Sequence, residues 1–175
     1  MYNVGVFGHR AGDWHIEPDI LKSRIRNVID VLRFQYGREL ILNVDGESGA
    51  GVEVIDLAIE LKVKYNMFLV SSPEFNKVFY ENENEKAMAK RLEAQYNNSY
   101  GITIRSSMYN KSFEIDRDRL LIDGSSFLIC FWEEKKQGRT FDMIKYSLAT
   151  NKLVLNGLSD LKMISNIDLK KRRRQ

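Results

Sequence analysis

The sequence predicts a single α/β domain with a Rossmann-like, mainly parallel sheet of about five or more strands and helices on both faces. Short apolar runs alternate along the chain with segments whose apolar residues recur at helical spacing. The apolar runs are continuous rather than alternating, which is typical of parallel strands covered on both faces. With 175 residues, of which 43% are hydrophobic and 29% charged, the chain has the size and composition of one soluble domain with its own core.

The first half of the chain gives three strands and two helices. Val4–Phe7 is an apolar run that ends at a glycine, and we expect a buried first strand there. An amphipathic helix follows over Pro18–Tyr36, because apolar residues recur at helical spacing and proline suits its first turn. Leu40–Val44 is the second predicted strand. A mostly apolar helix over Gly51–Tyr65 and a third strand at Met67–Val70 complete this half.

The segment 71–111 is polar and rich in asparagine and glutamate. Within it we expect a solvent-facing helix over Glu83–Gln95 and a short strand at Ile102–Ile104. The segment is long for a connection inside a compact domain, and such connections are often functional. We therefore interpret residues 71–111 as a polar insertion or lid.

In the last third of the chain, predicted helices and strands alternate regularly again. The expected order is a helix over Glu114–Ile122, an apolar strand at Ser126–Phe131, a helix with Phe141, Ile144 and Leu148 on one face, and a strand at Lys152–Leu155. One short helix and a basic, disordered tail over 168–175 close the domain, which spans 1–175.

Composition restricts the classes of function. The lone cysteine, Cys130, lies inside an apolar strand, so we expect a buried, inert thiol and no internal disulfide. No signal peptide and no membrane-spanning run is predicted, which favours the cytoplasm and no membrane partner.

The net charge of +3 includes five positive charges in Lys170–Arg174, so the rest of the chain carries −2. The tail could touch nucleic acid, but it has no interleaved aromatic residues for base stacking.

Three glycine-containing turns follow predicted strands. They are Gly8-His9-Arg10, the run Gly46-Glu47-Ser48-Gly49-Ala50-Gly51, and Gly138-Arg139-Thr140. Because ligands of parallel sheets sit at the carboxyl ends of the strands, the fold should bring these turns to one edge. Glycine allows close backbone approach, and the helices that follow present free N–H groups suited to an anion.

Each turn adds polar side chains whose roles have structural alternatives. Ser48 offers a hydroxyl, and Arg139 could clamp a phosphate or be a solvated loop arginine. Thr140 could contact the ligand or simply be the N-cap of its helix. Glu53, expected in the first turn of the second helix, could be functional or could only complement the helix dipole.

His9 and Arg10 follow a buried strand directly and could donate to an anion. His15 is the only other histidine, and neither histidine has an evident partner in the sequence. No histidine–cysteine metal site, no cofactor and no Ser-His-Asp arrangement is therefore predicted. The second turn lacks the endings of a P-loop and of the dinucleotide fingerprint.

These three turns, in this order, resemble those of the SLOG superfamily, which includes the lonely-guy phosphoribohydrolases and the DNA-processing protein A fold. The resemblance is strongest to a small bacterial and phage branch with a Gly-His-Arg motif, and it covers most of residues 2–156 except the polar middle. It implies a Rossmannoid fold, a nucleotide or nucleotide-derived ligand at the glycine turns, and a homo-oligomer.

Two functions remain open on these grounds. In the first, the turns bind a nucleotide-like ligand without turnover. In the second, the protein is an N-glycosidase that hydrolyses a nucleoside 5′-monophosphate. Glu53 matches the glutamate of the enzymatic branch by position, and Glu47 is a second candidate. This sequence has Glu47-Ser48-Gly49-Ala50-Gly51 where those enzymes carry Pro-Gly-Gly-x-Gly-Thr, and Gly-Arg-Thr where Gly-Gly-Thr is common in the Gly-His-Arg branch.

Overall fold

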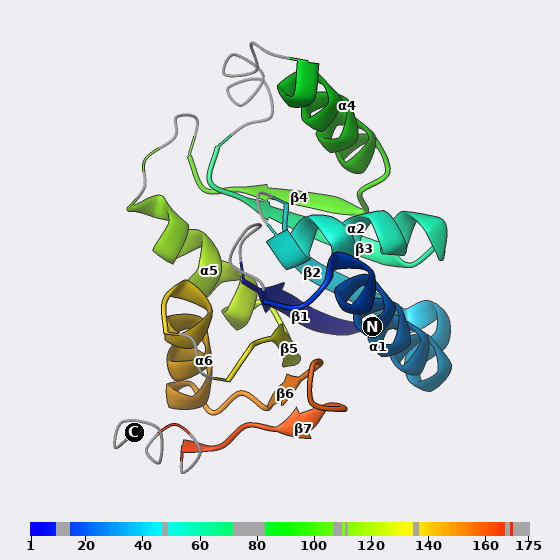
Figure 1. The fold of residues 1–175 in the computed structure, drawn as a ribbon. Coiled ribbons are helices and arrows are strands. Elements are labelled where there is room, and N and C mark those ends of the chain that lie inside the picture. Colours follow the sequence, from blue (N-terminus) through cyan, green and yellow to red (C-terminus); the bar gives the residue numbers. More distant parts are fainter. Residues whose placement is uncertain are drawn as a thin grey trace.

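The computed structural model confirms the predicted α/β class (Figure 1). It describes residues 1–9, 15–46, 49–71, 83–106, 110, 112–134, 137–166 and 169. The strands in this part of the chain are β1 (Tyr2–Gly8), β2 (Leu40–Asp45), β3 (Lys64–Leu69), β4 (Gly101–Ile104), β5 (Phe127–Phe131), β6 (Val154–Asn156) and β7 (Lys162–Met163). The helices are α1 (Pro18–Tyr36), α2 (Gly49–Glu60), α4 (Glu83–Asn97), α5 (Phe113–Asp123) and α6 (Arg139–Ala149), with a 3₁₀ turn η1 (Gly37–Glu39).

The described strands form one sheet in the order β4-β3-β2-β1-β5-β6-β7. Neighbouring strands from β4 to β6 are parallel, and only β7 runs antiparallel to its neighbour. The chain builds outward from β1 to β4 and then returns to the other side of β1 with β5. The β1/β5 boundary is therefore the topological switch point, beside which ligands of such sheets bind.

Helices cover both faces of the sheet, as predicted (Figure 1). Side chains of α1 and α2 pack on one face against Val4, Leu42 and Phe131, among others. Side chains of α5 and α6 pack on the other face against Phe7 and Leu128. In β1 and β5, buried residues alternate between these two cores, which explains why these two central strands are mostly apolar.

The second helix differs from its prediction at both ends. It begins at Gly49 rather than Gly51 and ends at Glu60 rather than Tyr65. The helix stops because Lys62 has a φ of 55° and the Val63 N–H donates to the carbonyl oxygen of Ala58. This is the hydrogen bonding of a helix C-terminus with a left-handed residue. The chain then enters β3 at Lys64, three residues before the predicted strand.

The other differences are smaller. β6 begins at Val154, two residues later than predicted, and β7 was not expected because two residues carry no periodic pattern. Positive φ angles at Asp160 and Leu161 make the turn that reverses the chain into β7. The segment predicted as a polar insertion contains the helix α4 and the strand β4, and β4 extends the sheet beyond β3. Its role as a lid stays a prediction, and much of it lies outside the described residues.

Cys130 is fully buried in β5, as predicted, and burial raises the pKa of its thiol. An uncharged thiol without solvent contact is a poor nucleophile. This residue therefore belongs to the core and not to a reactive site.

Candidate functional site

The β1/β5 switch point is built around His9, which directly follows β1 and is 6% exposed. Its Nε2 accepts a hydrogen bond from the Glu133 N–H at 3.1 Å, so this nitrogen is unprotonated and the ring proton sits on Nδ1 when the ring is neutral. Its carbonyl oxygen accepts from the Ala50 N–H at 3.3 Å. His9 thereby ties β1 to the end of β5 and to the first turn of α2.

Glu133 contacts both histidines, His9 through its backbone N–H and His15 through its carboxylate. The His15 N–H donates to one carboxylate oxygen of Glu133 at 2.7 Å, and His15 Nδ1 lies 2.8 Å from the other. The Glu133 side chain is only 15% exposed, whereas that of His15 is 78% exposed. Neither partner could be predicted from the sequence, because Glu133 lies more than a hundred positions from both histidines.

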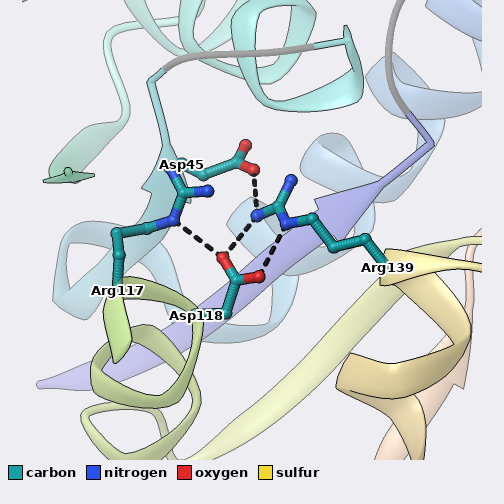
Figure 2. Close-up of polar contacts among 4 residues, drawn as sticks. All are labelled: Asp45, Arg117, Asp118 and Arg139. Carbon is teal, nitrogen blue, oxygen red and sulfur yellow. Dashed lines mark hydrogen bonds and ion pairs between the residues drawn. The ribbon is translucent and has the colours of Figure 1, made fainter. Parts of the chain in front are cut away.

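A buried charge cluster lies beside this point, at the end of β2 (Figure 2). Arg139, the first residue of α6, donates through Nη2 to Asp45 Oδ2 at 2.7 Å and through Nε to Asp118 Oδ2 at 2.6 Å. Arg117 Nε donates to the other oxygen of Asp118 at 2.7 Å. Asp45, Asp118 and Arg117 are each at least 94% buried. The four side chains carry two positive and two negative charges, so the cluster is neutral.

The neighbouring carboxylates keep Arg139 charged. Burial lowers the pKa of its guanidinium, but Asp45 and Asp118 more than offset this effect and raise the pKa above its ordinary value. Asp45 Oδ1, in contrast, is buried and makes no hydrogen bond within the described part of the chain. A buried carboxylate oxygen without a donor carries an uncompensated desolvation cost. This oxygen lies against Gly51, in the first turn of α2.

The glycines of the second turn allow α2 to start against the end of β2. Gly49 and Gly51 lie in the first turn of the helix, and Gly49 has a φ of 48°. A Cβ on Gly51 would stand 2.0 Å from Asp45 Oδ1, and one on Gly46 would stand 2.2 Å from the terminal methyl of Met67. A Cβ on Gly8 would similarly meet Ala50 Cβ at 2.7 Å. Gly51 requires glycine because the Asp45 carbonyl oxygen would stand only 2.1 Å from the added Cβ, whereas the flexible end of Met67 could move away from a Cβ on Gly46.

The third turn differs in detail from its prediction. α6 begins at Arg139 with Gly138 as its N-cap residue, so Thr140 lies inside the helix and is not the cap. Gly138 has a φ of 119°, which an L side chain rarely adopts, and with this residue as the cap the helix starts two residues earlier than it would with a threonine cap at position 140. Arg139 is not a solvated loop residue, because its side chain is 17% exposed and held by two carboxylates.

Glu53 lies apart from the charge cluster, at the packing surface between α2 and α4. It falls in the second turn of α2 rather than the first, because the helix starts two residues early. Its Oε1 accepts from Arg91 Nη2 at 2.8 Å, and Arg91 also pairs with Asp56 at 2.6 Å. The side chain of Glu53 is 33% exposed. Arg10, Glu47 and Ser48 lie outside the described residues.

A cleft of about 690 Å³ opens between α5 and α6, next to the charge cluster. Its walls include the apolar side chains of Ile115 and Met143 and the ring of Tyr146, and Asp118 and Arg139 contribute to it. This volume lies within the range of about 300–1,000 Å³ that is usual for small-molecule sites. The Asp118–Arg139 ion pair thus stands between the cleft and the carboxyl edge of the sheet.

Sequence reasoning missed Asp45, Asp118 and Glu133 as members of the site. An acidic residue at the carboxyl end of an apolar strand was a usable signal for Asp45, and the same holds for Glu133 after β5. Asp118 gave no signal, because a single carboxylate in an amphipathic helix is ordinary.

Among the described residues, no group of three or more His, Cys, Asp or Glu side chains is arranged to hold a metal ion. None of the helices in the same residues is long and apolar enough to cross a membrane.

Comparison with known proteins identifies the fold. No protein-family model matches the sequence, and no curated protein matches it significantly. The X-ray structure of DNA processing protein A from Streptococcus pneumoniae superimposes with a TM-score of 0.65 at 17% sequence identity. The match covers 91% of this chain and 53% of that chain, so the protein spans about half the length of its structural neighbour. The fold is therefore Rossmann-like and similar to that of DNA processing protein A.

Proposed function

We propose that the protein binds a nucleotide or nucleotide-derived ligand at the carboxyl edge of the sheet. The observation that carries this proposal is the convergence of the three glycine turns on one edge. The Ala50 N–H meets the carbonyl of His9, which joins the first turn to the second. Arg139 meets Asp45, which joins the third turn to the second. The Rossmannoid fold itself agrees with a nucleotide as ligand.

The donors for a phosphate group are the helix N-termini rather than Arg139. Both α2 and α6 begin at this edge; α2 starts with Gly49, and α6 has Gly138 as its N-cap residue. The first N–H groups of a helix have no partner within it and carry the positive end of the dipole. Arg139 contributes little net charge to an incoming anion because Asp45 and Asp118 already neutralise the cluster.

Asp45 favours a ligand that carries hydroxyl groups next to its phosphate. The unpartnered Oδ1 of Asp45 lies against Gly51, in the first turn of α2. A carboxylate oxygen accepts from the hydroxyls of a ribose and repels a phosphate oxygen. Helix N-termini for the phosphate and a carboxylate for the sugar together suit a nucleotide better than inorganic phosphate.

A thermal-shift screen of nucleotides tests the binding proposal, because a ligand that binds the folded state raises the unfolding temperature by mass action. Gly49→Asp places a carboxylate at the α2 N-terminus and should abolish the shift. Gly49→Asn is the matched control: asparagine and aspartate both tolerate the left-handed region, and only the charge differs. Equal shifts in both variants, or no shift with any nucleotide in the unmodified protein, would refute the proposal.

Hydrolysis of an N-glycosidic bond is the second candidate function, favoured by the buried carboxylate of Asp45 at this edge. A carboxylate beside the sugar would stabilise the positive charge that develops on the ribosyl ring. Glu53 remains the alternative carboxylate by resemblance, although it is engaged by Arg91. Chromatography of the same samples would detect base release from a nucleoside monophosphate. Release that is lost in Asp45→Asn but kept in Glu53→Gln would assign the role to Asp45, and the reverse would assign it to Glu53.

Nucleic-acid binding through Lys170–Arg174 and assembly into a homo-oligomer stay proposals. The structural neighbour is named for DNA processing, and the tail lies outside the described residues. Removing residues 170–175 and measuring retention on DNA and RNA columns tests the tail. Light scattering of the purified protein tests the oligomer.

A further inference from the structure

A second concave site lies at the opposite edge of the sheet, where β2 and β3 begin. It has a volume of about 550 Å³ and is formed by the end of α1, the turn η1 and the loop between α2 and β3. We name it the amino-edge pocket. It shares no residue with the carboxyl-edge site, so nothing in the proposed function accounts for it.

Positive charge is concentrated in the amino-edge pocket. Its lining contains four cations and one carboxylate, which gives a local charge of +3, although the chain without its tail carries −2. The cations are Arg33, Arg38, Lys62 and Lys64, and the carboxylate is Asp30. The like charges repel one another in the empty pocket, and a bound anion would relieve that repulsion.

The dipole of α1 explains only part of this charge. Arg33 lies in the last turn of α1 and pairs with Asp30 at 3.3 Å, and Arg38 follows the helix end, where cations are generally favourable. Lys62 and Lys64 come from a different segment. Lys62 occupies a left-handed position, with a φ of 55°, at which glycine is the usual residue. The backbone conformation therefore does not account for the lysine, and its ammonium group adds to the positive charge that the end of α1 brings.

The same pocket carries an unusually exposed aromatic side chain. Phe34 is 93% exposed, although its helix neighbour Leu32 is buried. A second exposed ring lies next to one of the lining cations: Lys64 Nζ stands 5.0 Å from the ring centre of Tyr100, which is 55% exposed. Exposed rings beside cations provide a surface on which a planar heterocycle can stack.

We propose that the amino-edge pocket binds a nucleoside polyphosphate. The four cations match the three or four negative charges of a di- or triphosphate, and Phe34 provides a face for the base. The volume of about 550 Å³ suits one compact ligand of this size and falls within the usual range for small-molecule sites. The site is separate from the carboxyl-edge site and does not depend on it.

Calorimetric titration of the full chain with ATP tests this proposal, with inorganic triphosphate and adenosine as partial ligands. The charge-reversal variant is Arg38→Glu with Lys62→Glu, and its control is Lys22→Glu with Lys90→Glu, which makes the same charge change at exposed lysines elsewhere. We expect the first pair to weaken ATP binding by about tenfold or more and the control to change it little. Phe34→Ala should weaken ATP by about fivefold or more through lost stacking, and should leave triphosphate unchanged. Ile20→Ala, at a 53% exposed position of the same helix, is its control.

Three results would overturn the proposal. The first is no saturable ATP binding, and the second is equal weakening by the two charge-reversal pairs. The third is equal affinity for ATP and triphosphate with no effect of Phe34→Ala, which would reduce the pocket to an unspecific anion patch. ATP binding that survives Gly49→Asp but not the Arg38/Lys62 reversal would support this pocket independently of the carboxyl-edge site. The opposite pattern would support the carboxyl-edge site and exclude this one.

Discussion

Arg139 Nη2 and Asp45 Oδ2 lie 2.7 Å apart, although the two residues are 94 positions apart in the sequence. The contact fastens the first residue of α6 to the end of β2, and Asp118 fastens the same guanidinium to α5 (Figure 2). The end of β2 and the helices α5 and α6 are thereby held together at one edge of the sheet. The ion pairs fix the shape of the site rather than supply free charge to it.

Removing Arg139 should strongly destabilise the protein. In Arg139→Leu, two buried carboxylates lose their shared cation, and we expect the free energy of unfolding to fall by about 3–5 kcal/mol. Urea unfolding measures this loss. Arg105→Leu breaks an exposed pair with Asp116 and should cost less than about 1 kcal/mol. Similar losses in the two variants would contradict a buried, structurally essential cluster.

Gly51→Ala tests the close approach of α2 to β2. The added Cβ would stand 2.0 Å from Asp45 Oδ1 and 2.1 Å from the Asp45 carbonyl oxygen, so helix and strand must move apart. We expect a loss of about 1–3 kcal/mol, although alanine is otherwise the better helix former. Gly101→Ala meets only the side-chain oxygen of Asn66, at 2.8 Å, and should cost less because that side chain can turn away. A stabilising effect of Gly51→Ala would show that the predicted clash is absent.

Tyr65 makes stability depend on alkaline pH. Burial, with a contribution from Asp56, raises the pKa of Tyr65 from 10.0 to about 12. Because the folded-state pKa is the higher one, the stabilisation is complete below pH 10 and is lost as the pH rises from 10 through about 12. Tyr65→Phe also removes the hydrogen bond to the Gln95 carbonyl oxygen, a loss of about 0.5–1.5 kcal/mol at neutral pH.

The stability difference between the unmodified protein and Tyr65→Phe should therefore shrink as the pH increases. Urea unfolding at intervals from pH 8 to 11.5 measures it. Tyr100→Phe, at a 55% exposed position, is the matched control and should show no such trend. A difference that stays constant over this range would disprove the linkage.

Gln95 should matter more than Arg91 for the attachment of α4 to α2. The Gln95 side chain is fully buried, and its Nε2 donates to Val52 O at 3.2 Å and to Asp56 Oδ1 at 2.6 Å. Gln95→Leu removes both hydrogen bonds and takes the buried donor away from Asp56 Oδ1, so it should lower the stability of the α4 region by about 1–3 kcal/mol. Arg91→Leu removes half-exposed ion pairs and should cost less than about 1 kcal/mol.

Hydrogen exchange of the α4 amides distinguishes these two variants, because it reports local opening of the helix. Faster exchange confined to α4 in Gln95→Leu is the expected result. If Arg91→Leu accelerated exchange as much, the ion pairs rather than the buried amide would hold the helix.

The order of strands and helices could be predicted because each element carries its own periodicity. The helix over Pro18–Tyr36 was predicted at its observed bounds, since its apolar residues, its first-turn proline and its terminal glycine all lie within the same stretch. The α2 boundaries were predicted wrongly for a local reason. Val63, Tyr65 and Met67 continue an apolar pattern that fits helix and strand alike, and only the left-handed Lys62 separates the two.

The sequence by itself determined the fold class, the buried cysteine and the glycine positions from which an anion site was proposed. Those features depend on residue types and on spacings of a few residues, and both can be read directly along the sequence. Only the tertiary structure decided that Arg139 is neutralised by Asp45 and Asp118, that both histidines meet Glu133, and that cations from two segments share a pocket with Phe34. Charge interactions depend on distance in space. The parallel crossovers bring together residues that lie far apart in the chain, and no periodicity along the sequence records that pairing.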